Sequence, residues 1–361
     1  MITGLDLRDF KGHRRTGVRL GTFTMLVGDN ASGKSSVLEA LAILGGLASG
    51  PVEAMTRFGL AQDIVRRSQT QMRLSATSAG GGSVRLEIET TDQPSQVSCT
   101  ARLTANRDPQ GTTDLTVRWV ESGGIVASQS AIQGGWRSPL DVVGNIALYS
   151  LDATRVARGD VVADPSVVVA ADGANTGAIL AALRLAEDPA YEKIQASLRL
   201  LVPSVERFSI RQHADGGRVV NRLVFDFVGA PKVPASGASR GTLVVLAILA
   251  ILHQPRRPNV ILLDDFDHAL HPRAQMELVR TLRTMLTMPA FADVQIVATT
   301  HSPYVLDEMA LSDIHVFALA GDGTVRTKPL AAHPQAAATR GTLTPGQLWS
   351  LDPERSWVVE E

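Results

Sequence analysis

The chain has 361 residues, of which 44% are hydrophobic and 20% are charged, and its formal net charge is -1. This composition is typical of a globular protein with one large domain or two, and it excludes a global basic field that would attract nucleic acid or anionic lipid. A single cysteine, Cys99, excludes a disulfide framework and a cysteine-based metal site.

The sequence predicts neither a targeting segment nor a membrane span. Residues 1–10 alternate and carry charge, unlike the apolar core of a signal peptide. The longest apolar stretch, Leu243–Leu252, is too short to cross a bilayer. We therefore expect a cytoplasmic protein that does not contact the membrane.

The N-terminal region predicts strands followed by a helix. Hydrophobic alternation indicates the strands, and the polar run Phe10–Arg15 is expected to be a turn. A glycine-rich loop follows the last strand, and Gly45 and Gly46 are expected to end the helix. The predicted strands are Ile2–Leu7, Val18–Leu20 and Phe23–Val27, and the predicted helix is Ser35–Leu44.

The middle of the chain changes character. Residues 72–132 alternate between turn clusters and predict an antiparallel meander. Two helices are expected next, the first capped by Asn175, and then another pair of strands. The meander strands are Met72–Thr77, Val84–Thr90, Gln96–Leu103 and Leu115–Val120, with turns at 79–82 and 108–111; the helices are Thr176–Glu187 and Tyr191–Leu201; the later strands are Val205–Arg211 and Arg218–Val228.

The C-terminal half alternates between helix and strand. Short β-branched runs separated by amphipathic helices predict a parallel sheet with helices on its faces. Residues 331–361 are expected to be irregular, with a docking segment at Leu348 and Trp349. The predicted helices are Gly241–His253, Arg273–Leu286 and Tyr304–Met309, and the strands are Val260–Leu263, Val294–Ala298 and Ile314–Ala320.

The glycine-rich loop Gly28–Ser35 has the form G-x-x-x-x-G-K-S, with a strand before it and a helix after it. In that context the backbone N–H groups surround phosphates at the positive end of the helix. Lys34 is expected to contact the β- and γ-phosphates, and the Ser35 hydroxyl to bind magnesium. The expected nucleotide-binding residues here are Asn30, Ala31, Ser32, Gly33, Lys34, Ser35 and Ser36.

Two carboxylates follow the buried strand Val260–Leu263. A hydrophobic strand near the loop strand places its terminal acid at the magnesium, so Asp264 is the expected metal ligand. Asp265 is expected to polarise the attacking water. Two solvated acids before a helix are the simpler explanation, but the loop motif favours the catalytic one.

A small, hydroxyl-rich turn, Ala235–Gly241, precedes the long apolar helix. Such a turn is an anion site, in which Ser236 Oγ and the N–H of Gly237 would contact a γ-phosphate. A plain helix cap with a flexible turn explains the same string equally well.

His301 follows the predicted strand Val294–Ala298 within a few residues. A histidine at the carboxyl edge of a parallel sheet is placed to bind a γ-phosphate or water, although a lone histidine there is more often structural. His253, His268 and His271 are interpreted as structural or interface residues, because no metal-ligand spacing joins them.

These elements, in this order, resemble the ABC ATPase superfamily, and specifically its RecF/SMC/OLD-like branch. The resemblance covers most of the chain, and it is weakest over residues 72–132 and the tail. It matches Ile2–Phe10 and Phe23–Leu44 with the branch's opening, Ala235–Ser239 with the signature loop, Leu262–Asp265 with Walker B, Ala269–Pro272 with the D-loop, and Thr300–Ser302 with the switch histidine.

The resemblance implies an α/β fold: a RecA-like, mostly parallel sheet with an antiparallel β subdomain and a small helical signature lobe. It further implies ATP and Mg²⁺ as cofactors, and a head-to-tail homodimer in which Lys34, Asp265 and His301 are catalytic. The implied domain is 1–330, divided into 1–71 with the loop, 72–150 antiparallel, 151–240 helical and 241–330 with Walker B and His301, before a tail at 331–361.

The chain departs from the family's pattern at several positions. Asp265 stands where the family has glutamate, so we expect slow hydrolysis. Ala238 and Ser239 replace the glycine and glutamine of transporters. The Q-loop residue is left open among Gln62, Gln69 and Gln71. No long heptad insertion is present, and too few residues follow His301 for a Toprim nuclease domain.

Three functions are weighed. The first is a standalone ATPase that acts as a nucleotide-gated switch or scaffold for a separate effector, a nuclease or toxin, in bacterial defence against phage or plasmids; the role in defence rests on analogy. The second is a RecF-like repair clamp whose dimer groove holds DNA, which the net charge disfavours. The third is a scaffold that binds ATP with little turnover. A transporter motor fits least.

Overall fold

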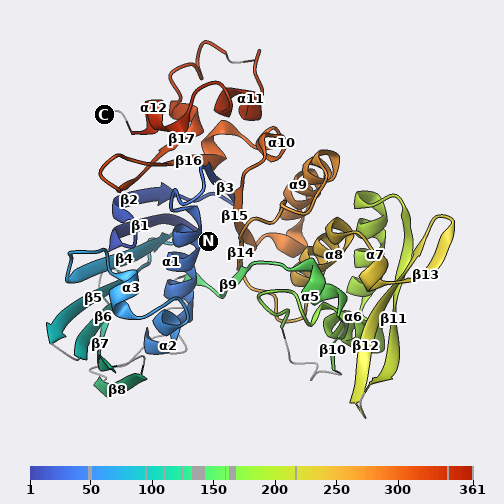
Figure 1. Ribbon diagram of the computed structural model, residues 1–361, viewed down its shortest axis with the longest axis horizontal. Helices are drawn as coiled ribbons and strands as arrows, with labels where there is room; N and C mark the ends of the chain where they lie inside the picture. The colour runs from blue at the N-terminus through green and yellow to red at the C-terminus, as the bar shows by residue number, and fades with distance from the viewer. Residues whose placement is uncertain are drawn as a thin grey trace. The chain divides into compact units, whose positions relative to one another are not determined.

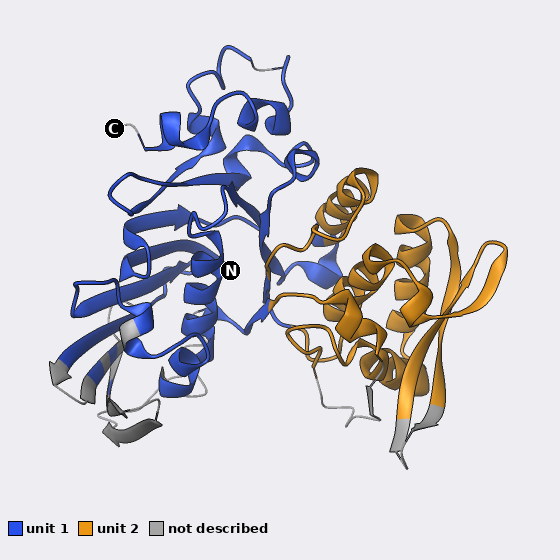
Figure 2. Cartoon of the chain, viewed as in Figure 1, with its two compact units in different colours: residues 1–148, 258–262, 286–361 blue, residues 149–257, 263–285 orange. Residues whose placement is uncertain are grey.

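The chain divides into two compact units, each described here by itself (Figure 2). Unit 1 comprises residues 1–148, 258–262 and 286–361, and unit 2 comprises residues 149–257 and 263–285. A single ATPase domain over 1–330 stays a prediction. The computed structural model describes residues 1–47, 51–93, 96–108, 111–122, 125–131, 143–158, 160–161, 168–215, 218–339 and 341–359, so that the predicted turn residues Pro109 and Gln110 lie outside it.

Unit 1 holds a six-stranded sheet in the order β17-β16-β3-β15-β14-β9, apart from the last residues of β9 and β14, which belong to unit 2. β3 lies parallel to both β15 and β16, and the hairpin strand β17 is antiparallel to β16. The predicted mostly parallel core is confirmed. The strands are β3 Phe23–Gly28, β9 Ile146–Tyr149, β14 Val260–Leu263, β15 Gln295–Thr300, β16 Ile314–Leu319 and β17 Val325–Pro329.

The second sheet of unit 1 is antiparallel and has seven strands, in the order β2-β1-β4-β5-β6-β7-β8. The predicted meander is confirmed, but the sheet also includes the two N-terminal strands. Its strands are β1 Ile2–Phe10, β2 His13–Arg19, β4 Gln71–Ser78, β5 Ser83–Gln93, β6 Gln96–Asp108, β7 Gly111–Ser122 and β8 Ile125–Ala131.

The turn between β1 and β2 is shorter than predicted. It consists of Lys11 and Gly12, and β2 begins at His13. The prediction of a turn through Arg15 is wrong because the inward-facing positions of β2 begin with two polar residues, His13 and Thr16, which are both buried. Their polarity hides the alternation of the strand.

Helix α1, Lys34–Gly46, packs against both sheets of unit 1, on β3 and β15 and on β4 and β5 (Figure 1). The helix runs through Gly45 and ends at Gly46, two residues beyond the predicted Leu44. A Cβ at Gly45 would stand 2.5 Å from Cβ of Ile146. Gly45 therefore permits a close approach to β9 and does not end the helix. Two short helices follow, α2 Pro51–Thr56 and α3 Ala61–Ile64.

Unit 2 combines a small antiparallel sheet with helices. The sheet has the order β10-β12-β11, and β13 also pairs with β12. The apolar helix α8 lies against α5, α6 and α7, and all its residues from Thr242 to Leu252 are buried. The elements are α5 Ala153–Ala157, β10 Asp160–Val161, α6 Thr176–Leu185, α7 Pro189–Leu201, β11 Val205–Asp215, β12 Arg218–Phe227, β13 Ala230–Pro234, α8 Arg240–His253 and α9 Pro272–Leu286.

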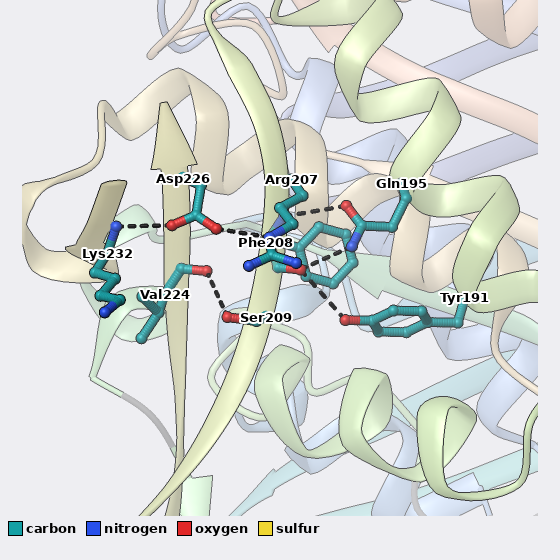
Figure 3. Close-up of polar contacts among 8 residues, drawn as sticks. All are labelled: Tyr191, Gln195, Arg207, Phe208, Ser209, Val224, Asp226 and Lys232. Atoms are coloured by element: carbon teal, nitrogen blue, oxygen red, sulfur yellow. Dashed lines mark hydrogen bonds and ion pairs between the residues drawn. The ribbon is translucent and has the colours of Figure 1, made fainter. Parts of the chain in front are cut away.

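A side-chain amide joins α7 to the outer edge of β11 (Figure 3). Gln195 Nε2 donates to the carbonyl of Phe208 over 2.7 Å, and Gln195 Oε1 accepts the N–H of Phe208 over 3.0 Å. These are the two bonds that a neighbouring strand would make with that residue. On β12, Asp226 pairs with Arg207 over 2.6 Å and accepts the N–H of Lys232 over 2.7 Å. The predicted pairs of helices and strands are confirmed.

The predicted cap of α6 is not made. Asn175 precedes the helix, but its Nδ2 donates to Val168 O over 2.8 Å and its Oδ1 accepts the N–H of Ala170 over 2.7 Å. The side chain therefore closes the preceding loop, and it makes no hydrogen bond with the first turn of α6.

The C-terminal segment is more ordered than predicted. Residues 331–361 contain two short helices, and Leu348 is buried, as expected for a docking residue. Lys328 Nζ donates to the carbonyl of Trp357 over 2.7 Å, which ties the last helix to β17. The remaining helices are α10 Pro303–Leu306, α11 Pro345–Trp349 and α12 Glu354–Val358, with 3-10 turns at Ala235–Gly237, Pro289–Phe291, Leu311–Asp313 and Leu330–Ala332.

Candidate functional site

The glycine-rich loop joins β3 to α1 in unit 1, as predicted. Gly28 has φ 144°, and a Cβ there would stand 2.1 Å from the carbonyl oxygen of Phe317 on β16. Gly33 has φ 95° and immediately precedes the helix. Both positions require glycine, because a side chain would clash or strain the backbone.

Lys34 turns back over the loop. Its Nζ donates to the carbonyls of Gly28 and Asp29, each over 2.8 Å, and lies 3.5 Å from Ser32 Oγ. The side chain is only 5% exposed. The loop thus holds a buried ammonium within its own curve, and this ammonium would face several negative charges if phosphates were bound.

A cavity of about 190 Å³ lies beside the loop. This is less than the 300 Å³ or more typical of a drug-sized ligand site. The cavity adjoins the whole second half of the loop. It is lined by Gly12, Ala31, Ser32, Gly33, Lys34, Ser35, Ser36, Leu319 and Val325.

His301 follows β15, the strand next to β3. The register pairs Thr300 with Val27, so His301 comes directly after the last paired position, level with the start of the loop. Its side chain is exposed. Thr300 Oγ1 accepts the N–H of Ser302 over 2.9 Å, which fixes the backbone on both sides of the histidine.

The two acids follow β14, which is separated from β3 by β15 in the sheet. The N–H of Asp264 donates to Tyr149 O over 2.9 Å, and the side chain of Asp264 is half-buried. Asp265 is exposed and has φ 46°, a left-handed conformation that side chains other than glycine, asparagine and aspartate seldom adopt. The backbone therefore turns sharply at Asp265, and the His268 N–H donates to its carbonyl over 3.2 Å.

The Ser236 turn does not open the long helix, contrary to the predicted anion site at a helix start. Ala235–Gly237 form a separate 3-10 turn, and Ala238 is extended. Ser239 is the cap of α8, where its Oγ accepts the N–H of Thr242 over 3.1 Å. Ser236 and Gly237 are both exposed. The proposed role of Ser236 and Gly237 in phosphate binding therefore rests on the Ala235–Gly237 turn alone, without the N–H groups of a helix start.

One residue beside the loop was not predicted from the sequence. His13, the first residue of β2, is fully buried, and its Nε2 lies 3.1 Å from the carbonyl of Gly33. The sequence around His13 did not predict this contact, because polar residues at the start of a strand show no hydrophobic alternation. Of the other histidines, His253 is half-buried, and desolvation lowers its pKa to about 4.

Two groups of known proteins resemble the chain. The AAA_21 family model, described as "AAA domain, putative AbiEii toxin, Type IV TA system", matches residues 23–118 and 198–307, more than half of the chain. The chain belongs to this family. The expected membership of a P-loop ATPase family is confirmed. Among proteins with curated descriptions, none matches the sequence.

Solved structures show the same fold. An SMC head bound to the C-terminal winged-helix domain of ScpA matches with a TM-score of 0.56 at 15% identity, covering 91% of this chain and 96% of that one. An SMC head with an extended coiled coil, bound to the C-terminal domain of ScpA derived from Pyrococcus furiosus, matches with a TM-score of 0.51 at 12% identity, covering 91% and 96%. The expected α/β head is confirmed. Among the described helices, none has the length and apolar character of a bilayer span.

Proposed function

We propose that this chain binds and hydrolyses Mg-ATP and works as a nucleotide-gated switch for a separate protein. One observation carries the proposal: the Gly28–Ser35 loop lies between β3 and α1, its lysine is buried on the loop carbonyls, and a cavity of about 190 Å³ adjoins it. A buried cation at the N-terminal end of a helix fits a polyphosphate better than it fits a neutral ligand. Family membership supports ATP as the nucleotide.

We propose Mg²⁺ as the cofactor that accompanies the nucleotide. Mg²⁺ keeps several waters and takes one or two protein oxygens besides those of phosphate. Ser35 and Asp264 would supply these two oxygens. Among the described residues, no cluster of three His, Cys, Asp or Glu side chains forms a separate metal centre. Asp265 would orient the attacking water, and His301 would hydrogen-bond the terminal phosphate or that water.

The proposed active form is a head-to-tail homodimer. Ser236 and Gly237 are exposed on the Ala235–Gly237 turn of unit 2. An exposed turn of small residues is suited to close a nucleotide site on a second copy of the chain. A two-fold arrangement would then bury two nucleotides in one interface.

The proposed effector is a nuclease or toxin, with a role in defence against phage or plasmids. The proposal of a toxin setting is motivated by the family description, which names a putative AbiEii toxin of a type IV toxin–antitoxin system. The titles of the similar SMC heads name ScpA as a bound partner of those proteins.

Phosphate release measured together with molecular mass tests the proposal. We expect phosphate release that requires Mg²⁺, and a shift from monomer to dimer with ATP but not with ADP. No nucleotide binding at all would reject the proposed function. Binding without release would favour the alternative of an ATP scaffold with little turnover.

A second candidate, nucleic-acid binding, is favoured by one feature of the antiparallel sheet. Cross-strand register aligns Arg15, Arg8 and Arg73 on three adjacent strands, and the row continues through Glu87 to Arg102. Arg8, Arg15 and Arg102 are exposed. Neighbouring strands are about 4.8 Å apart, so the row concentrates positive charge in a chain of net charge -1. A phosphate backbone is a natural counterpart.

Binding of duplex DNA at two salt concentrations tests this candidate. If the row binds phosphates, affinity falls steeply with salt, and Arg15→Ser reduces the salt dependence. Arg240→Ser, at an exposed arginine of unit 2, is the matched control. Salt-independent or absent binding would remove nucleic acid from the candidates.

A further inference from the structure

His13 lies directly against the residue that turns the phosphate loop into α1. Its ring is fully buried at the start of β2. Nε2 lies 3.1 Å from Gly33 O, and Nδ1 lies 3.0 Å from Thr16 Oγ1. The imidazole therefore joins the antiparallel sheet to the loop, twenty residues along the chain.

The hydrogen-bond partners of His13 determine which tautomer of the imidazole is present. A carbonyl oxygen only accepts, so Nε2 carries the hydrogen and donates to Gly33. Nδ1 then accepts from the Thr16 hydroxyl. Burial lowers the pKa of His13 to about 4, against the opposing effect of its bond to Gly33, so the ring is neutral at physiological pH. A fixed neutral tautomer is a rigid support.

Gly33 is held closely from one side. A Cβ at Gly33 would stand 2.9 Å from His13 Nε2 and 2.8 Å from Val325 Cγ2. Gly33 is also the N-cap of α1, with no side-chain cap. Its carbonyl accepts the first helical N–H, from Val37, over 3.3 Å. The orientation of this one peptide group thus governs both the end of the loop and the start of the helix.

We propose that His13 is a positioning residue that holds the Gly33 peptide so that the amides of the loop face a bound phosphate chain. The inference rests on the proposed nucleotide binding. His13 has no contact with the ligand in this account. It acts through Gly33, whose carbonyl would otherwise keep only the 3.3 Å helical bond from Val37 among these two contacts, and the amide of Lys34 belongs to the same peptide group. The Thr16 hydroxyl fixes the ring in turn.

The test compares binding of Mg-ATP and of inorganic tripolyphosphate in five proteins by calorimetry, with thermal unfolding alongside. They are the wild type, His13→Leu, His13→Gln, Thr16→Val and a control, His315→Leu. His315 is a suitable control because it is also buried in unit 1, and its Nε2 lies 2.9 Å from a carbonyl, that of Arg19, away from the loop. Binding by the wild type is measured first, since its absence would reject the proposed function itself.

We expect His13→Leu to weaken both ligands about tenfold, because a buried bond of ordinary strength is lost. His13→Gln should recover most of that loss, since its amide N–H reaches the same carbonyl, and Thr16→Val should weaken binding about threefold. His315→Leu should lower the melting temperature and leave affinity unchanged. If His13→Leu does not fold, His13→Gln and Thr16→Val still test the proposal. Thr16→Val should then bind about threefold more weakly than the wild type, and His13→Gln should bind nearly as tightly as the wild type.

Three results would overturn the inference. Unchanged affinity in the folded His13 and Thr16 variants would show that the loop needs no support from the imidazole. An equal loss in His13→Leu and His315→Leu would make the effect one of general stability. A loss for ATP that is absent for tripolyphosphate would place His13 at the base of the nucleotide and not at the phosphate loop.

Discussion

At the scale of single residues, the loop shows how a short motif determines a local site. Gly28 and Gly33 provide backbone angles that other residues seldom adopt, and Lys34 fills the resulting curve with positive charge. Each of these properties is local, so the sequence predicted it. The support from His13 is not local, because residues twenty positions apart form it and its polar strand carries no distinguishing pattern.

Lys34→Ala should weaken Mg-ATP binding by about a hundredfold or more, because charge-assisted bonds to phosphate are the strongest in such a site. Calorimetry of the folded variant measures the loss. Lys193→Ala, at an exposed lysine of α7 in unit 2, is a control expected to bind with near-normal affinity. Unchanged affinity in Lys34→Ala would mean that the loop is not the phosphate site.

Asp265→Glu should hydrolyse ATP faster than the wild type, and Asp265→Ala should hydrolyse it more slowly. The reason is reach: a general base must come within roughly 2.6–3.2 Å of the water, and aspartate is one methylene shorter than glutamate. Phosphate release at saturating ATP measures the rates. Equal rates in the three proteins would show that position 265 has no catalytic part.

The lowered pKa values of two histidines predict how the stability of the protein depends on pH. Burial lowers the pKa of His13 and His253 to about 4 from an ordinary value of 6.5, so the unfolded chain binds more protons between these values. Each should add stability that is fully present above pH 6.5 and decreases by about 1.4 kcal/mol per pH unit as pH falls toward 4. Urea unfolding between pH 7 and 4.5 should therefore be less pH-dependent in His13→Gln. An identical slope would contradict a neutral, buried His13.

At the scale of elements, the sequence predicted the central strands well and the ends of elements poorly. β3, β14 and the strands of the meander have continuous or alternating apolar residues, which periodicity detects. The glycines at the end of α1 misled the prediction, because Gly45 serves packing against Ile146. Helices α11 and α12 have only five residues each, too few for a helical period to appear.

The same limit applies to the arginine row. Arg73 is far from Arg8 and Arg15 in sequence, and only the register of three strands brings the three side chains into one row. Net charge alone gave no indication of this surface.

Arg8→Glu should stabilise the antiparallel sheet by about 0.5–1 kcal/mol, because like charges that lie directly opposite each other on neighbouring strands are replaced by opposite ones. Urea unfolding at low salt measures the gain, which should shrink at high salt. Arg14→Glu, at an exposed position next to the row, is the matched control. A loss of stability in Arg8→Glu would mean that the row is not repulsive.

At the scale of the whole molecule, the fold is that of an SMC head, and the chain belongs to an ATPase family. The proposed dimer follows from where the proposed site residues lie within one chain. The loop and its lysine form one side of a phosphate site, while Ser236 and Gly237 are exposed on a turn of the other unit. If these turns close sites on a second copy, ATP becomes part of the interface, and hydrolysis opens it.

Mixing two inactive variants tests this central claim most directly. Lys34→Ala removes the loop cation, and Ser236→Arg blocks the turn, so each protein alone should release no phosphate. In the mixed dimer, one site lacks both groups, and the other combines an intact Lys34 with an intact Ser236 from its partner. Phosphate release should return on mixing. Its rate per mixed dimer should be at most about half that of the wild type, because one of two equivalent sites is intact. No release from a mixture whose subunits are shown to exchange would contradict sites that are shared between chains and fire independently.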